Sequence, residues 1–173
     1  MDRMNGDSTV RARLLLNVLA GVACALLLII GSARAQNGDT VSGHATGAFD
    51  VKLAPETVAP PDPSFGRMSI DKTFHGPLEA TSKGEMLTTG NPASSAAAYV
   101  ALETVTGTLD GHAGSFTLMH SATMVRGQGT LSITVASDSG TGALTGLTGK
   151  MNIRIEAGKH DYDFDYTLPA GAK

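Results

Sequence analysis

The sequence predicts an all-β protein, a closed antiparallel barrel of about eight strands. Between residues 43 and 169, apolar and polar side chains alternate in one run after another, which is typical of half-buried strands. Turn-forming glycine, proline and aspartate residues separate the runs, and no run has the periodicity of a helix. Because closure removes the unpaired edges of a sheet, strands of this length and evenness favour a barrel over a sandwich.

Residues 1–35 are predicted to be a cleaved signal peptide. Arginines precede the apolar run 14–30, and Ala33-Arg34-Ala35 supplies the small residues that a signal peptidase reads, so we expect cleavage before Gln36. The alternative is an uncleaved anchor, because the run is near the short limit for a membrane-spanning helix. The cleaved protein would be periplasmic or secreted, would keep no stable membrane span, and would begin with a short tether over residues 36–42.

Composition argues against several classes of function. The single cysteine, Cys24, lies in the predicted signal peptide, so the exported chain holds no disulfide and no catalytic thiolate. The formal net charge of −3 and the scattered basic residues argue against a nucleic-acid surface, which needs a basic stripe. The sequence has no nucleophile elbow, phosphate loop or dinucleotide fingerprint, and its five histidines show no metal-ligand spacing. We therefore expect no cofactor and no metal.

The first strands are predicted on either side of a proline-rich loop. Residues 43–53 alternate as a half-buried strand, and residues 54–66 form an irregular loop, because proline cannot join a ladder centrally. Residues 67–87 then alternate without a break, either as one strand bent at Gly76-Pro77 or as two strands joined there by a tight turn. The small residues of this run indicate a tightly curved wall, or room for another group. Its core-facing phase comprises Met68, Ile70, Lys72, Phe74, Gly76, Leu78, Ala80, Ser82, Gly84 and Met86.

The stretch 99–124 predicts the central hairpin of the barrel. Either Asp110-Gly111 or Gly111-His112 forms the turn, because a two-residue turn needs positive φ, which Asp and Gly tolerate. Both registers place Glu103 and His120 on one face. That face also carries apolar side chains, so we expect it to point inward.

The next strand is predicted at 130–136, where apolar side chains alternate with serine and threonine. The segment 138–149 follows and is rich in glycine and threonine. It is predicted to form no stable helix, apart from one turn at 142–146.

The last hairpin joins the runs 151–156 and 160–166, with its turn at Ala157-Gly158 or Gly158-Lys159. Its outward face carries three aspartates that mimic the start of a calcium loop. The Gly and Glu that such a loop requires at its sixth and twelfth positions are missing, so we predict a solvated strand face. Residues 170–173 should fray as a tail, which gives a barrel domain of 43–169.

Five phrases of the sequence are distinctive: HATGAFDVK (44–52), GRMSIDKTFHGPLEATSKGEML (66–87), YVALETVTGTLDGHAGSFTLMHSATM (99–124), SDSGTGALTGLTGKMNI (137–153) and GKHDYDFDYTLP (158–169). Together they resemble a bacterial family catalogued as a domain of unknown function. Known members of that family form a barrel similar to that of allene oxide cyclase, so the resemblance implies a lipocalin-sized barrel. It implies no activity, because the family has none and the cyclase's catalytic pattern is not recognised here.

Glu103 and His120 are the candidate catalytic residues. Burial raises the pKa of a carboxyl group and lowers that of a histidine unless they pair, and such tuning makes an acid and a base. The alternative is a structural pair that only fixes the register. The interior side chains expected to contact a ligand are Tyr99, Phe116, Leu118, Met124, Met86, Tyr162 and Phe164.

Three functions fit this barrel. The first is an exported, non-enzymatic protein that binds a small apolar or amphipathic molecule in its interior. The second is a cofactor-independent isomerase or cyclase that uses Glu103 and His120 as acid and base. The third is a structural protein with a filled core. Each of the three functions is compatible with a homo-oligomer. An interior void of a few hundred Å³ that reaches solvent would support the first two.

Overall fold

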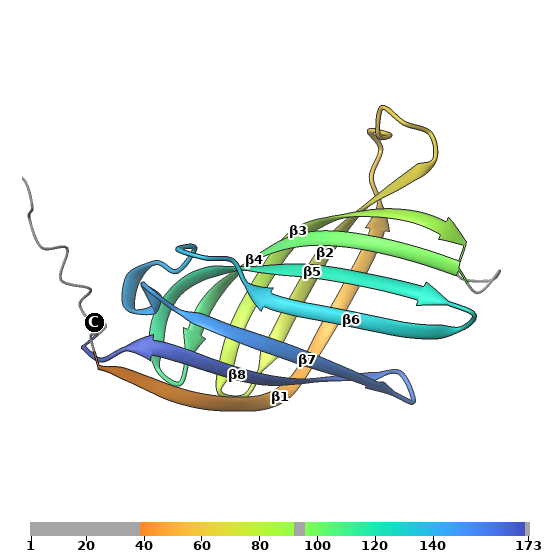
Figure 1. Cartoon of the computed structure of the whole chain (residues 1–173). Coiled ribbons are helices and arrows are strands. Elements are labelled where there is room, and N and C mark those ends of the chain that lie inside the picture. The colour runs from red at the N-terminus through yellow and green to blue at the C-terminus, as the bar shows by residue number, and fades with distance from the viewer. Residues whose placement is uncertain (1–38, 92–95, 172–173) are drawn as a thin grey trace, which may run out of the picture. The chain divides into compact units, whose positions relative to one another are not determined.

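The computed structural model describes residues 39–91 and 96–171, which form an eight-stranded antiparallel barrel (Figure 1). Each strand pairs with its neighbours in chain order, and β1 pairs with β8 to close the sheet. The all-β class and the closed barrel are therefore confirmed. The strands are β1 (Thr40–Pro55), β2 (Phe65–His75), β3 (Leu78–Asn91), β4 (Ala96–Leu109), β5 (His112–Val125), β6 (Gln128–Val135), β7 (Thr148–Glu156) and β8 (Lys159–Pro169).

Parts of the sequence prediction fall outside this description. The signal peptide, its cleavage site and the end of the C-terminal tail lie beyond the described residues. Within the described ranges, no helix has both the length and the apolar character needed to cross a membrane.

The central hairpin has the first of its two predicted registers. Asp110-Gly111 is the turn, with φ of 48° and 82°. Glu103 then pairs with Leu118, and His120 pairs with Ala101. All four side chains are buried, so the predicted inward face of this hairpin is confirmed.

The other two uncertain turns are also settled. Residues 67–87 form two strands, because β2 and β3 meet at Gly76-Pro77, where Gly76 has a φ of 106° that favours glycine. The last hairpin turns at Ala157-Gly158, with φ of 49° and 79°. Asp161, Asp163 and Asp165 lie on the outer face of β8, as predicted.

Strand ends differ from the prediction on both sides of β1. This strand begins at Thr40, inside the predicted tether, because Thr40 and Val41 pair with the last residues of β8. The proline-rich loop is shorter than predicted, since Pro55 pairs with Met68 and β2 already begins at Phe65. Residues distant in sequence supply these pairings, so local alternation does not predict them.

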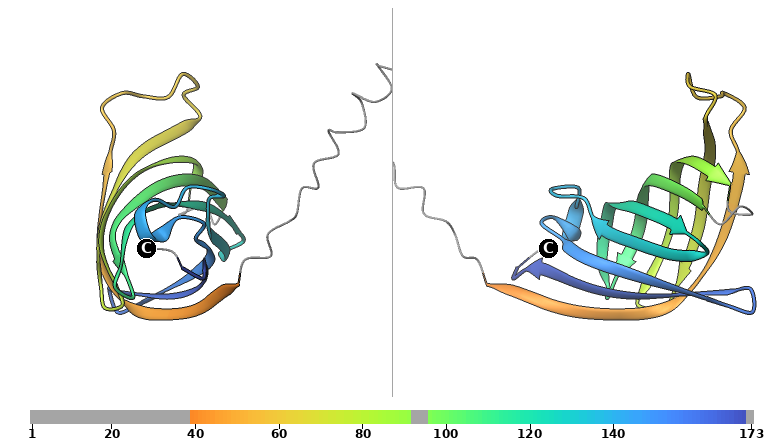
Figure 2. Two further views of the ribbon diagram at one scale, coloured as in Figure 1. Left: turned by 90° about the vertical axis from the view of Figure 1, so that its left-hand side faces the viewer. Right: turned by 45° about the vertical axis from the view of Figure 1, so that its right-hand side comes forward.

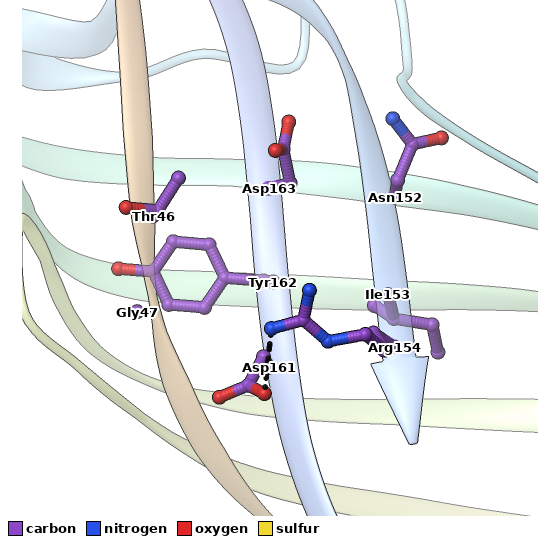
Figure 3. A pocket seen from close by; sticks show the side chains of 8 residues that line it. All are labelled: Thr46, Gly47, Asn152, Ile153, Arg154, Asp161, Tyr162 and Asp163. Atoms are coloured by element: carbon purple, nitrogen blue, oxygen red, sulfur yellow. Dashed lines mark hydrogen bonds and ion pairs between the residues drawn. The ribbon is translucent and has the colours of Figure 1, made fainter. Parts of the chain in front are cut away.

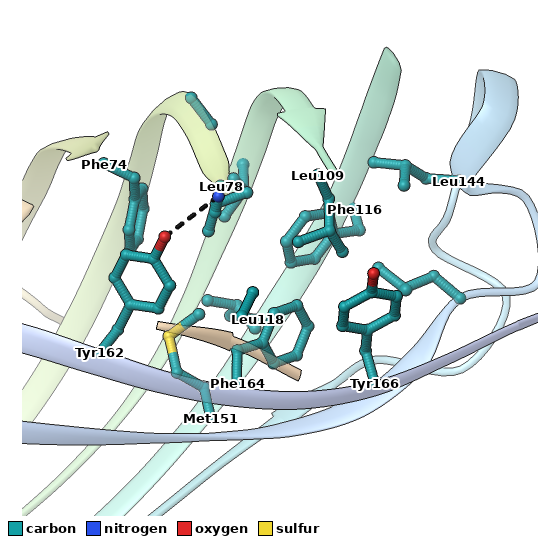
Figure 4. Close-up of a cluster of buried hydrophobic side chains, with 14 of the residues drawn as sticks. Phe74, Leu78, Leu109, Phe116, Leu118, Leu144, Met151, Tyr162, Phe164 and Tyr166 are labelled. Carbon is teal, nitrogen blue, oxygen red and sulfur yellow. Dashed lines mark hydrogen bonds between the residues drawn. The ribbon is translucent and has the colours of Figure 1, made fainter. Parts of the chain in front are cut away.

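The interior is packed at one end of the barrel. There Phe116 and Phe164 stack with ring centroids 5.8 Å apart, beside Tyr166 (Figure 4). The 3₁₀ turn η2 (Gly142–Leu144), predicted from the sequence as one turn, covers this end, and Leu144 is buried against the core. The left view of Figure 2 looks onto the end that carries η2. The β1–β2, β5–β6 and β7–β8 connections lie at the opposite end.

The ladder between β6 and β7 is short. Among the described residues two pairs join these strands, Ile133 with Met151 and Thr134 with Lys150. Toward the end opposite η2, residues 128–132 and 152–156 diverge, as Figure 1 shows. The barrel is therefore closed near its packed end and splayed along this seam.

Candidate functional site

The end opposite η2 contains a cavity of about 820 Å³, a size typical of small-molecule sites. Strands β1 to β8 all contribute to its lining, which is mostly apolar. Its rim includes Leu53, Leu131 and Ile155, which are exposed, so the cavity reaches solvent. The residues that flank the β6–β7 seam are part of this rim.

Lys72, Glu103 and His120 meet at the floor of the cavity, where it borders the packed core. Lys72 Nζ donates a hydrogen bond to Glu103 Oε2 at 2.7 Å. His120 Nε2 lies 3.0 Å from the same oxygen but lacks the alignment of a hydrogen bond. Ser82 donates its hydroxyl to the other carboxylate oxygen of Glu103. We call these four residues the floor cluster.

Small residues on β3 make room for the floor cluster. β3 lies between β2, which carries Lys72, and β4, which carries Glu103, so their ion pair crosses β3 on its inner side. Gly84 pairs with Glu103, and a Cβ there would lie 2.8 Å from the Cα of Glu103. Ser82 is the next inward position and reaches Glu103 with its hydroxyl. Room for another group, one of the two predicted reasons for small residues here, is observed.

The floor cluster keeps Glu103 ionised. Burial alone would raise the pKa of Glu103, but the contact with His120, the charge and hydrogen bond of Lys72 and the hydroxyl of Ser82 lower it to about 2. Lys72 is also stabilised by aromatic rings, since its Nζ lies 5.2 Å from the centroid of Phe49 and 5.6 Å from that of Phe74.

The three ionisable members of the floor cluster differ in their access to the cavity. Lys72 and His120 line it with exposed fractions of 8% and 4%, whereas Glu103 is 0% exposed and lies beneath them. A fully buried carboxylate with so low a pKa is a poor proton acceptor. The geometry therefore favours a positioning role for Glu103, which neutralises Lys72 and fixes it beside His120.

The predicted ligand-contacting residues are divided between the two halves of the barrel. Three of them line the cavity: Met86, Tyr99 and Met124. The others belong to the packed core, away from the cavity: Phe116, Leu118, Tyr162 and Phe164. All seven point inward, so alternation identified their face. It could not identify the level along the barrel axis at which packing ends.

Lys72 and Ser82 were not among the predicted site residues. The available signal was the position of Lys72 in a core-facing phase, between Ile70 and Phe74, because a buried charge needs a buried partner. Its partner Glu103 is on a strand that is not adjacent to β2, so no local pattern indicates the pair.

A second hollow, of about 580 Å³, is lined by β1, β7 and β8 (Figure 3). Its charged groups include Arg154 and Asp161, which are paired at 3.2 Å. The ring of Tyr162 lies beside Gly47, and its hydroxyl donates to the carbonyl of His75 and accepts from the amide of Leu78. These polar groups already have partners within the protein.

One set of exposed side chains on β1 and β8 has the spacing of a cation site. Ligand atoms of His44, Asp163 and Asp165 lie within 4.8 Å of one another. His44 Nδ1 is hydrogen-bonded to Asp165 at 2.7 Å, and this bond raises the pKa of His44. All three side chains are more than half exposed, which is the setting of an ordinary surface ion pair.

Comparison with known proteins gives a family match. The family described as "Protein of unknown function (DUF3224)" matches residues 45–166, which include the whole floor cluster. Among solved structures, the crystal structure of a DUF3224-family protein of unknown function from Shewanella oneidensis MR-1 is 46% identical, with a TM-score of 0.67. The alignment covers 73% of this chain and 96% of that one. The comparison with curated proteins gave no significant match.

Proposed function

The chain belongs to the DUF3224 family, and from its cavity we propose that it binds a small apolar or amphipathic molecule inside the barrel. The observation that carries this proposal is the 820 Å³ cavity, which is largely apolar and open to solvent. A few polar groups converge at its floor, which is the usual composition of a small-molecule site. A structural protein with a filled core would have no such hollow half.

An isomerase or cyclase receives less support from the same geometry. The acid–base hypothesis requires both Glu103 and His120 to reach the substrate. Glu103 lies beneath the floor, and three neighbours hold its pKa at about 2. Binding requires only the cavity and the two side chains that line its floor.

We also propose that the protein acts in the periplasm or is secreted. The support for this proposal is the charged, apolar and small-residue pattern of residues 1–35. N-terminal sequencing of the protein expressed in a bacterial host tests it. We expect the mature chain to begin at Gln36, and an N-terminus retained at Met1 would contradict the proposal.

The binding proposal is tested with a neutral apolar fluorophore, N-phenyl-1-naphthylamine, which brightens in apolar sites. We expect saturable binding to the wild-type protein, and loss of binding in Ala122→Phe, which places a ring in the cavity. Val100→Phe is the matched control, because Val100 is exposed on the outer face of β4. Native mass spectrometry of the exported protein would look for a co-purified molecule. Absence of saturable binding to the wild type, or equal binding by Ala122→Phe, would contradict the proposal.

A further inference from the structure

We infer that the ligand is an anionic amphiphile, whose head, such as a carboxylate, contacts Lys72 at the floor, beside His120. Its apolar part would lie along the wall toward the rim. This inference rests on the proposed binding function and names the class of ligand. It follows from the charges that face the cavity, from the unused donors at the floor and from the position of Glu103.

The side chains that line the cavity give it a cationic interior. Its ionisable residues are Lys72, Tyr99, His120 and His160, and no carboxylate is among the described residues that line it. Glu103, which balances Lys72, is hidden beneath the floor. A cationic head would therefore face the Lys72 ammonium without a carboxylate of its own, whereas an anionic head would accept hydrogen bonds from that ammonium.

Lys72 keeps hydrogen-bonding capacity for such a head. An ammonium group has three donors, and the described part of the chain offers Lys72 one acceptor, Glu103 Oε2 at 2.7 Å. The neighbouring rings of Phe49 and Phe74 attract the charge but accept no conventional hydrogen bond. The remaining donors can therefore bind an acceptor that enters from the cavity.

The position of the head along the barrel follows from where the charged donor lies. Lys72 lines the floor of the cavity, whereas Glu103, which balances its charge, is fully buried beneath it. At the rim the polar lining residues include Thr88, Thr89 and Thr130, which are neutral, so the head is expected at the floor and not at the mouth.

The test compares three probes that share a twelve-carbon chain and differ in the head: dodecanoate, dodecanol and dodecylammonium. The two ionic probes are used below their micellar concentrations, and dodecanol below its solubility limit, to displace N-phenyl-1-naphthylamine from the protein. For the wild type we expect dodecanoate to displace at a concentration about tenfold or more below that of dodecanol, with dodecylammonium weakest. Equal potency of dodecanoate and dodecanol, or a preference for dodecylammonium, would overturn the inference.

Variants then locate the preference at the floor. Lys72→Met removes the ammonium at similar length, and Lys52→Met is the control, because Lys52 lies on the outer face of β1. Lys72→Met alone leaves the buried Glu103 without its ion-pair partner. The double variant Lys72→Met/Glu103→Gln therefore removes both charges. We expect the double variant to bind the neutral fluorophore and to lose the tenfold carboxylate preference, while Lys52→Met keeps it.

The outcomes separate the two proposals. A wild type that binds the fluorophore but shows no carboxylate preference contradicts the anionic head and leaves the binding function intact. A wild type that binds no fluorophore contradicts the binding function itself. A double variant that retains the full preference would place the anion elsewhere and would overturn the role of Lys72.

Discussion

At the scale of single residues, Glu103 links the stability of the barrel to pH. Its pKa is about 2 in the folded protein against an ordinary 4.5, so the unfolded state binds more protons between these values. The stabilisation is therefore complete above about pH 4.5 and is lost as pH falls toward 2. The shift corresponds to something on the order of 3 kcal/mol.

Thermal melts between pH 7 and pH 2 test this linkage with Glu103→Gln. We expect the variant to melt well below the wild type at pH 7, because Lys72 is left buried without its carboxylate, and the two Tm values to converge near pH 2. Glu85→Gln serves as the control, since Glu85 is exposed and paired with Arg67. A difference in Tm between the wild type and Glu103→Gln that stays constant with pH would contradict a pKa of about 2 for Glu103.

Gly84 gives a second prediction, about the space that the floor cluster needs. A Cβ at Gly84 would lie 2.5 Å from the carbonyl oxygen of Leu102 and 2.8 Å from the Cα of Glu103, so β3 and β4 would have to separate. We expect Gly84→Ala to lower the free energy of unfolding by roughly 1–3 kcal/mol in urea denaturation. Gly129→Ala is the matched control, because its nearest neighbour is 4.0 Å away, and equal effects of the two changes would count against this account.

The sequence predicted that Glu103 and His120 lie together but did not predict that Lys72 joins them, because the strands that carry these residues are related differently. Glu103 and His120 lie on the two strands of one tight hairpin, so the parity of the turn fixes their common face. Lys72 reaches Glu103 across β3, and the sequence shows only that a lysine interrupts an apolar phase. Hairpin partners can be predicted from local pattern, whereas a contact that skips a strand requires the curvature of the barrel.

At the scale of elements, alternation located each strand but not its limits. β1 extends to Thr40 because β8 offers pairing partners there, and residues far along the sequence carry that information. The same holds for β6 and β7, which alternate as regular strands and yet share a short ladder. Alternation reports which face of a strand is buried and does not report which neighbour completes its hydrogen bonds.

The seam between β6 and β7 leads to a prediction for hydrogen exchange. Residues 128–132 pair with β5 and residues 152–156 pair with β8, but these two segments are not paired with each other. Alternate amides in both segments, those that face the seam, should exchange much faster than the amides of β4, which is paired along both edges. Residue-resolved exchange measured by NMR checks this, and uniform protection across β6 and β7 would show that the seam is closed in solution.

At the scale of the whole molecule, the barrel divides into a half that gives stability and a half that is open. The sequence could not show this division, because inward-facing side chains recur with the same period in both halves. The two halves differ in how their ends are filled, which depends on the three-dimensional structure. The segment around η2 fills one end with Leu144 and Leu147, while β6 and β7 diverge toward the other end, where the cavity reaches solvent.

Two leucines on neighbouring strands test whether stability and binding are assigned to different halves. Leu118 on β5 is 0% exposed in the packed core, and Leu131 on β6 is 39% exposed at the cavity rim. We expect Leu118→Ala to lower the free energy of unfolding by about 2–5 kcal/mol, and Leu131→Ala to lower it by less than about 1 kcal/mol. Binding of N-phenyl-1-naphthylamine should show the reverse order, weakened several-fold by Leu131→Ala and unchanged by Leu118→Ala at temperatures where that variant is folded. The division would be wrong if one substitution had the larger effect on both urea denaturation and fluorophore affinity, because a single cooperative interior would then carry both properties.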